Sequence, residues 1–158
     1  MTPKSNQPGA VVVDANIALS IAANEPSQPM ISGEIEAYSQ RGFEFFSPGV
    51  LVTETLYVLC GKLNDGTLSS SDHALAIKKL DLFLKNVSHS PGGDAKLLLR
   101  AEAIRGNYTC RRSADGIYIA LAEELALVRP TVLLTLDADM YRQAGKNARS
   151  VDVRLLTI

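Results

Sequence analysis

Cysteine, histidine and tryptophan are scarce in this sequence: its 158 residues include two cysteines, two histidines and no tryptophan. Cys60 and Cys110 lie far apart and form neither a CxxC pair nor a zinc-binding pattern. We expect both thiols to be reduced and largely buried, because free cysteine is among the residue types most often found buried. His73 and His89 lie in segments away from the acidic residues considered below, and we interpret them as surface or structural residues.

Long apolar runs and phosphate-binding loops are also missing. No stretch approaches the ~20 apolar residues that cross a bilayer, and the polar residues 1–9 lack the apolar centre of a signal peptide. We therefore expect a cytoplasmic protein without membrane contact, with a flexible tail at residues 1–9 and a single domain at 10–158. The sequence contains no GxxxxGK(S/T) or GxGxxG loop and no GxSxG nucleophile elbow.

The charge is nearly balanced overall but unevenly distributed. The net charge is −1, with three basic and eight acidic residues in 1–76 and thirteen basic and nine acidic residues in 77–158. A basic second half suits a polyanionic partner, although ordinary helix-surface charge explains the same numbers and is favoured by this feature alone.

Apolar runs alternate between strand and helix patterns along the chain. Short runs rich in β-branched or aromatic residues predict strands, and stretches with apolar residues three or four apart predict helices. The expected strands are 10–15, 43–47, 87–90, 131–136 and 151–158, and the expected helices are 17–23, 30–40, 49–63, 70–85, 94–105, 114–128 and 138–145. We interpret 49–63 as a mostly buried helix and Ser113 as the N-cap of 114–128. Strands that alternate with helices predict an α/β fold whose mainly parallel sheet is covered on both faces.

Four acidic residues interrupt the most apolar stretches of the chain. They are Asp14 in VVVDANIAL, Glu54 in LVTETLYVL, Asp115 in RRSADGIYIALAEEL and Asp137 in VLLTLDADM. Asp14 ends the first predicted strand, Asp137 follows the predicted strand 131–136, and Glu54 and Asp115 lie within predicted helices. Because binding sites of parallel α/β sheets form at the carboxyl ends of the strands, we expect all four to approach one crevice.

Each acid also has an ordinary structural explanation. Asp14 and Asp137 could cap helices, and for Asp14 taken alone the cap is the favoured interpretation. Asp115 suits the positive end of a helix dipole. Glu54 shares a helical face with apolar neighbours, and a structural ion pair explains it as well as a site does. The convergence of all four at one sheet edge favours a site, in which mutual repulsion of the carboxylates would be relieved by a cation. A site of oxygen ligands without histidine or cysteine suits Mg²⁺ or Mn²⁺, which promote hydrolysis of phosphate esters.

These segments resemble the successive motifs of the PIN domain family. The resemblance extends from about residue 10 to 158 through VVVDANIAL, VTETLYVL, SADGIYIALAEEL and LLTLDADM. It implies a three-layer α/β/α sandwich and a ribonuclease site that requires Mg²⁺ or Mn²⁺. By position it implies two groups of site residues: the metal-binding acids Asp14, Glu54, Asp115 and Asp137, and the supporting polar residues Asn16, Ser113 and Thr135.

The small, single-domain form resembles the VapC-type toxin of a VapBC toxin–antitoxin pair. That resemblance implies an RNA substrate, a small antitoxin partner and a homodimer. Our hypothesis is hydrolysis of an RNA phosphodiester that leaves a 3′-hydroxyl and a 5′-phosphate. The basic residues considered for the RNA backbone are Arg111 and Arg112, which precede Asp115 closely, and Arg142 and Lys146, for which a plain surface role is favoured.

Two other interpretations stay open at the level of the sequence. One is a PIN-like binding module that has lost nuclease activity. The other is a phosphatase or phosphotransferase with Asp14 as the nucleophile, because Asp-x-Asn after a first strand also fits such enzymes. The second interpretation leaves Glu54 without a role.

Overall fold

A parallel β-sheet forms the centre of the chain. The computed structural model describes residues 7–106 and 109–157, without the side chain of Arg112. Within these residues five strands form one sheet in the order β3-β2-β1-β4-β5, and every neighbouring pair is parallel. The strands are β1 (Ala10–Val13), β2 (Glu44–Phe46), β3 (Val87–Ser88), β4 (Thr131–Thr135) and β5 (Asp152–Leu155). The predicted α/β fold class is confirmed.

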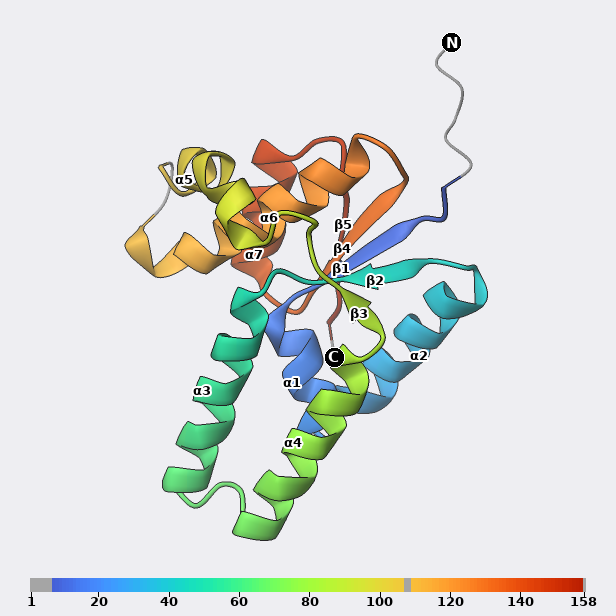
Figure 1. Ribbon diagram of the computed structural model, residues 1–158. Coiled ribbons are helices and arrows are strands. Elements are labelled where there is room, and N and C mark those ends of the chain that lie inside the picture. The colour runs from blue at the N-terminus through green and yellow to red at the C-terminus, as the bar shows by residue number, and fades with distance from the viewer. Residues whose placement is uncertain (1–6, 107–108, 158) are drawn as a thin grey trace.

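Helices cover both faces of the sheet, which gives the expected three layers (Figure 1). On one side lie α1 (Ala15–Ala22), α2 (Gln28–Gln40), α3 (Val50–Asn64) and α4 (Ser70–Leu84). On the other side lie α5 (Leu98–Arg105), α6 (Ser113–Ala126) and α7 (Ala138–Asn147), with the short 3₁₀ helices η1 (Asp94–Leu97) and η2 (Cys110–Arg112). Among the described residues, no helix is both long and apolar enough to cross a membrane.

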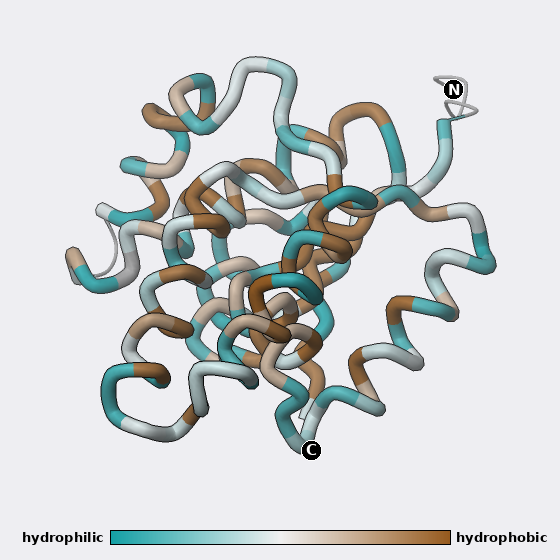
Figure 2. Tube along the Cα trace, turned by 60° about the horizontal axis from the view of Figure 1, so that its bottom comes forward, coloured by the Kyte–Doolittle hydropathy of each residue, from teal (hydrophilic) through white to brown (hydrophobic). Residues whose placement is uncertain are grey.

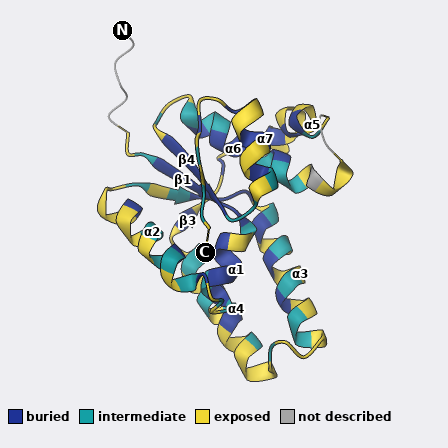
Figure 3. Cartoon of the chain, turned by 180° about the vertical axis from the view of Figure 1, so that it is seen from behind, coloured by how far each residue is buried: buried dark blue, intermediate teal, exposed yellow. Residues whose placement is uncertain are grey.

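The two central strands are fully enclosed. All residues of β1 and β4 are buried, because α1 packs against the sheet from one side and α6 from the other. Enclosure on both faces explains why the run AVVV is continuously apolar rather than alternating. Hydrophobic segments are concentrated in the interior of the chain trace in Figure 2, and β1 and β4 are dark blue in the burial view of Figure 3.

The expectation that residues 49–63 form a mostly buried helix is wrong. Helix α3 buries only the stripe Leu51, Thr55 and Leu59, which packs toward α1 and α4. Its other side is solvent-exposed and includes Leu56 and Tyr57, the latter 81% exposed. The cause is visible in Figures 1 and 3, where α3 and α4 extend side by side away from the sheet. No other helix or strand of the described residues covers the outer side of α3 there.

Some smaller predictions also need correction. Cys60 and Cys110 are free thiols but both are exposed, not buried. Cys60 lies on the uncovered side of α3, and Cys110 lies in the exposed turn before α6. The predicted strand 151–158 is shorter, and its last residue lies outside the described part of the chain, as do residues 1–6 of the predicted tail.

Candidate functional site

The four acids line one pocket at the carboxyl ends of β1 and β4. The strand order reverses direction between these neighbours, so this edge is the switch point at which open parallel sheets form binding crevices. The pocket has a volume of about 240 Å³. Its lining includes all four predicted acids together with Asn16, Arg111, Tyr118, and the side chains of Ala15, Leu19, Val58 and Met140.

Asp14 is the most enclosed of the acids, with 2% of its surface exposed. It follows β1 directly and caps α1, since its Oδ1 accepts the Ile17 amide hydrogen at 3.0 Å. Its Oδ2 accepts a hydrogen bond from the Thr135 hydroxyl at 2.5 Å. Burial raises the pKa of Asp14 to about 6, against the opposite effect of these two bonds, and the neighbouring Asp137 and Glu54 add to the rise. The capping role therefore coexists with a place in the acidic pocket.

Thr135 connects Asp14 to Asp137. Besides donating to Asp14, its Oγ1 accepts the amide hydrogen of Asp137 at 2.9 Å. The Asp137 carboxylate in turn caps α7, with Oδ1 accepting from the amides of Asp139 at 2.7 Å and Met140 at 3.4 Å. One fully buried threonine at the end of β4 thus fixes the positions of two of the acids.

Glu54 is held from the opposite layer by a tyrosine that the sequence analysis missed. The Tyr118 hydroxyl donates to Oε1 of Glu54 at 2.8 Å, and only 1% of the Tyr118 surface is exposed. Burial raises the pKa of Glu54, and the bond from Tyr118 opposes that rise. Burial and the adjacent Glu54 also hold the pKa of Tyr118 far above its ordinary value, so the phenol stays a hydrogen-bond donor. Tyr118 follows Asp115 by three residues and therefore lies on the same face of α6, and this spacing was the signal in the sequence that could have identified it.

Helix N-termini surround the pocket. Asp14 and Asp137 are the N-cap residues of α1 and α7, and Asp115 lies in the first turn of α6. The positive ends of three helix dipoles therefore lie beside these carboxylates, a position in which acidic side chains stabilise a helix. Glu54 differs, because it lies in the second turn of α3 and reaches the pocket through its longer side chain.

The chemistry of the donor set suits a hard divalent cation, although the carboxylates are not arranged around one. Within residues 7–106 and 109–157, no three His, Cys, Asp or Glu side chains are grouped closely enough to hold a metal ion. All candidate ligands are carboxylate oxygens, the type that Mg²⁺ and Mn²⁺ prefer. Each carboxylate has about four lone-pair positions, so the bonds made by Asp14, Glu54 and Asp137 leave acceptor capacity. The residues therefore fit Mg²⁺ or Mn²⁺ in ligand type and in acceptor capacity.

The predicted supporting residues do not all reach the pocket. Thr135 contacts Asp14, and the exposed Asn16 lines the pocket. Ser113 instead lines a neighbouring cavity between α5 and α6, and its hydroxyl donates to the Cys110 carbonyl at 2.6 Å. It is not the N-cap expected from sequence, because its backbone is already helical, with φ −60° and ψ −41°. The 3₁₀ turn η2 precedes it and leads directly into α6.

Among the predicted basic residues, Arg111 lines the acidic pocket. Arg142 forms an ion pair with Asp139 on the exposed surface of α7, and Lys146 is exposed on the same helix. Neither Arg142 nor Lys146 is among the described residues that line the pocket. The side chain of Arg112 lies outside the described part of the structure.

Comparison with known proteins gives a family and a fold. The model of the PIN domain family matches residues 11–146. No curated protein matches the chain. One chain of the crystal structure of VapBC2 from Rickettsia felis bound to a DNA fragment from their promoter is 12% identical, with 92% of this chain and 98% of that chain covered and a TM-score of 0.61. The crystal structure of PAE2754 from Pyrobaculum aerophilum is 18% identical, with 96% and 88% covered and a TM-score of 0.53.

Proposed function

The chain belongs to the PIN domain family, whose members are generally nucleases, and from this we propose that it is a ribonuclease that hydrolyses RNA phosphodiester bonds with Mg²⁺ or Mn²⁺. We further propose that it is the toxin of a VapBC-type toxin–antitoxin pair and acts in the cytoplasm. The single observation that carries the nuclease proposal is the meeting of Asp14, Glu54, Asp115 and Asp137 in one pocket at the switch point of the sheet.

The proposed roles follow from the contacts of each residue. The four acids would hold the ion, which when bound activates water and neutralises charge that develops on the phosphodiester. Thr135 fixes the Asp14 carboxylate, and Tyr118 fixes that of Glu54. Arg111, at the exposed margin of the pocket, supplies a positive charge for the RNA backbone. Arg112, Arg142 and Lys146 stay weaker candidates for that contact.

Two features support the toxin–antitoxin proposal. The Rickettsia felis structure is of a VapBC2 pair on a promoter fragment, and its matched chain shares the fold of this one. In addition, α3 exposes three large apolar side chains, with Val52 and Leu56 one turn apart and Tyr57 beside them. Exposed apolar patches of this kind mark protein interfaces, which supports both an antitoxin partner and a homodimer.

The aspartate-nucleophile alternative finds little support. Asp14 is almost fully enclosed, and both of its oxygens accept hydrogen bonds from the protein. A nucleophile needs an oxygen that can approach phosphorus in line. An inactive binding module is the stronger alternative, because within the described part of the chain the acids are not grouped around a metal position. Metal titration separates it from the nuclease.

The direct test is cleavage of single-stranded RNA by purified protein with Mg²⁺, Mn²⁺ or EDTA. We expect cleavage with either ion, none with EDTA, and loss of cleavage in Asp14→Asn. Asp72→Asn, which removes an exposed acid from the first turn of α4, is the matched control and should keep full activity. Full activity of Asp14→Asn would refute the site, and activity in EDTA would refute the metal requirement.

The toxin role has a separate test in living cells. Induction of the wild type should stop growth, induction of Asp14→Asn should not, and co-expression of a small protein from the adjacent gene should restore growth. Normal growth during wild-type induction, with cleavage intact in vitro, would retain the nuclease and reject the toxin role.

A further inference from the structure

The N-terminus of α3 is capped by a side chain from a distant part of the chain. The Asp94 carboxylate accepts the Gly49 amide hydrogen at Oδ1, 2.7 Å, and the Val50 amide hydrogen at Oδ2, 2.8 Å. The residues are 45 and 44 positions apart in sequence. Helix α3 has no capping side chain of its own, so Asp94 satisfies amides that would otherwise lack partners at this end.

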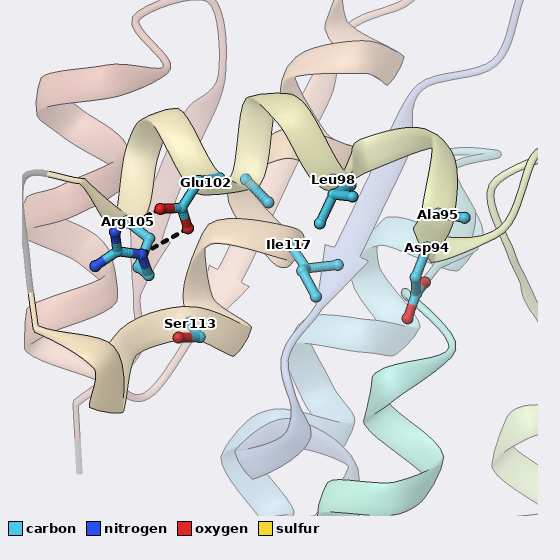
Figure 4. A pocket seen from close by; sticks show the side chains of 8 residues that line it. Asp94, Ala95, Leu98, Glu102, Arg105, Ser113 and Ile117 are labelled. Carbon is cyan, nitrogen blue, oxygen red and sulfur yellow. Dashed lines mark hydrogen bonds and ion pairs between the residues drawn. The ribbon is translucent and has the colours of Figure 1, made fainter.

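Hydrogen bonds and a turn in the segment before Asp94 place its side chain at the start of α3. The Ser88 carbonyl accepts the Ser47 amide hydrogen at 3.0 Å, and Nδ1 of His89 lies 2.9 Å from the Ser47 carbonyl oxygen. Gly93 then turns the chain with φ +65°, a conformation that favours glycine. Figure 4 shows the Asp94 carboxylate at the start of η1, pointing down toward the start of α3.

Among the described residues, this cap and a second hydrogen bond connect α3 to the layer that contains η1, α5 and α6. The backbone of α3 packs against α1 and α4, on the other side of the sheet. The second link is the bond from Tyr118 to Glu54. The two links are one helical turn apart on α3, because Glu54 follows Val50 by four residues, about 6 Å along the axis.

We propose that Asp94 is a positioning residue for the acidic pocket. By holding the start of α3 against η1, it fixes the position of α3 along its axis and its rotation about that axis, and so the position of the turn that carries Glu54. This inference rests on the proposed function for its effect on catalysis but not for its effect on structure. A helix that is capped from another layer cannot slide or rotate without breaking both bonds to Asp94. Without that restraint, only the packing of α3 on α1 and α4 and the bond from Tyr118 would position Glu54, and a shift of α3 could carry the carboxylate away from the other three acids.

The test compares Asp94→Ala and Asp94→Asn with Ser69→Ala. Ser69 caps α4 by accepting the Asp72 amide hydrogen at 3.1 Å, and no described residue of α4 lines the acidic pocket. Ser69→Ala therefore reproduces the loss of a helix cap without touching the position of Glu54. Asp94→Asn keeps one acceptor oxygen and serves as the variant that folds if Asp94→Ala does not.

The primary measurement is the ¹³C chemical shift of Glu54 Cδ and Tyr118 Cζ in the metal-free protein. We expect both resonances to move in the Asp94 variants, more in Asp94→Ala than in Asp94→Asn, and neither to move in Ser69→Ala. Unchanged resonances in both Asp94 variants would overturn the proposal, because the cap would then be only structural.

The second measurement connects position to function. With Mn²⁺ and RNA, we expect Asp94→Ala to weaken Mn²⁺ binding and to lower kcat by about tenfold each, with KM for RNA nearly unchanged, the size typical of residues that support metal ligands. Wild-type values in Asp94→Ala would overturn the proposal. A wild type that neither binds Mn²⁺ nor cleaves RNA would reject the proposed function instead, and the two resonances would still decide whether Asp94 positions Glu54.

Discussion

The Thr135 hydroxyl donates a 2.5 Å hydrogen bond to Oδ2 of Asp14, across the boundary between the two central strands. Oγ1 of Thr135 also accepts the Asp137 amide hydrogen at 2.9 Å. A residue that neither ionises nor reaches solvent thus determines where two acids of the pocket stand.

Thr135→Val should damage the site more than the fold. The variant keeps the shape of the side chain but leaves Oδ2 of Asp14 and the Asp137 amide without this partner. We expect a loss of about 1–3 kcal/mol in the free energy of unfolding, measured by urea denaturation, and a drop in activity of about 10–100-fold. Because the bond from Thr135 lowers the pKa of Asp14, that pKa should rise further, which carboxyl NMR would detect.

Thr131→Val provides the matched control for this experiment. Thr131 is a buried threonine of the same strand whose hydroxyl donates to the Arg129 carbonyl at 3.1 Å. Its replacement should lower stability without changing the pKa of Asp14 or the activity. Equal losses of activity in both variants would mean that Thr135 acts only through the stability of β4.

Asp14→Asn should make the metal-free protein more stable at neutral and higher pH. Burial raises the pKa of Asp14 from 3.8 to about 6. An acid with a raised pKa in the folded state favours folding most below its unfolded pKa, and this contribution is lost as the pH rises through the folded value. The difference between the two pKa values corresponds to about 3 kcal/mol of folding free energy that ionised Asp14 costs. Asparagine avoids this cost because it has no charge to bury. Asparagine is also a good helix N-cap.

The expected result is therefore a pH-dependent difference between Asp14→Asn and the wild type in urea denaturation with EDTA. The variant should be more stable by about 3 kcal/mol at pH 8, and the gain should shrink between pH 6 and pH 4. Asp72→Asn should show no such gain. An Asp14→Asn protein less stable than the wild type at pH 8 would contradict the assignment of Asp14 as a buried acid that costs stability in the absence of a cation.

The fold was predictable from sequence where local patterns decide structure. The runs AVVV and TVLLT consist almost entirely of β-branched or other apolar residues, which specifies buried strands. Asp14 and Asp137, which come soon after these runs, mark the carboxyl edge of the sheet. Helix α3 was harder, because a helix with apolar residues on several sides is usually enclosed, and sequence periodicity does not reveal that α3 projects beyond the sheet.

The site was predictable only in part because several of its contacts join distant segments. Asp94 reads as an ordinary acid after a Pro-Gly-Gly turn, and only the tertiary structure brings it to Gly49 and Val50. Tyr118 reads as a core aromatic of α6, and its hydroxyl gains meaning only when Glu54 approaches from α3. Spacing within one element predicts a face, but not which side chain of another layer will meet it.

Tyr118→Phe should shift the pH dependence of the reaction. Burial is the main cause that raises the pKa of Glu54, and the bond from Tyr118 lowers it. Removal of the hydroxyl leaves burial unopposed, so the pKa of Glu54 rises and a smaller fraction of it is ionised at a given pH. We expect the acid limb of the pH–kcat profile to move to higher pH, with a drop in activity of about tenfold at neutral pH.

Tyr141→Phe is the control for Tyr118→Phe, because Tyr141 lies on the exposed surface of α7. Its profile should coincide with that of the wild type. If Tyr118→Phe lowers activity equally at every pH, the tyrosine contributes packing rather than control over the charge of Glu54.

Arg111→Ala should weaken RNA binding in a salt-dependent way. Arg111 is exposed at the pocket that holds the acids, whereas Arg142 is engaged with Asp139 on α7. Each phosphate contact to single-stranded nucleic acid contributes about 0.7 to the slope of log K against log salt. Measured by fluorescence anisotropy in the Asp14→Asn background, where RNA should stay intact, Arg111→Ala should flatten that slope by about 0.7 and Arg142→Ala should leave it unchanged. An equal effect of the two replacements would mean that the RNA follows the general basic surface of the second half of the chain rather than a path through Arg111.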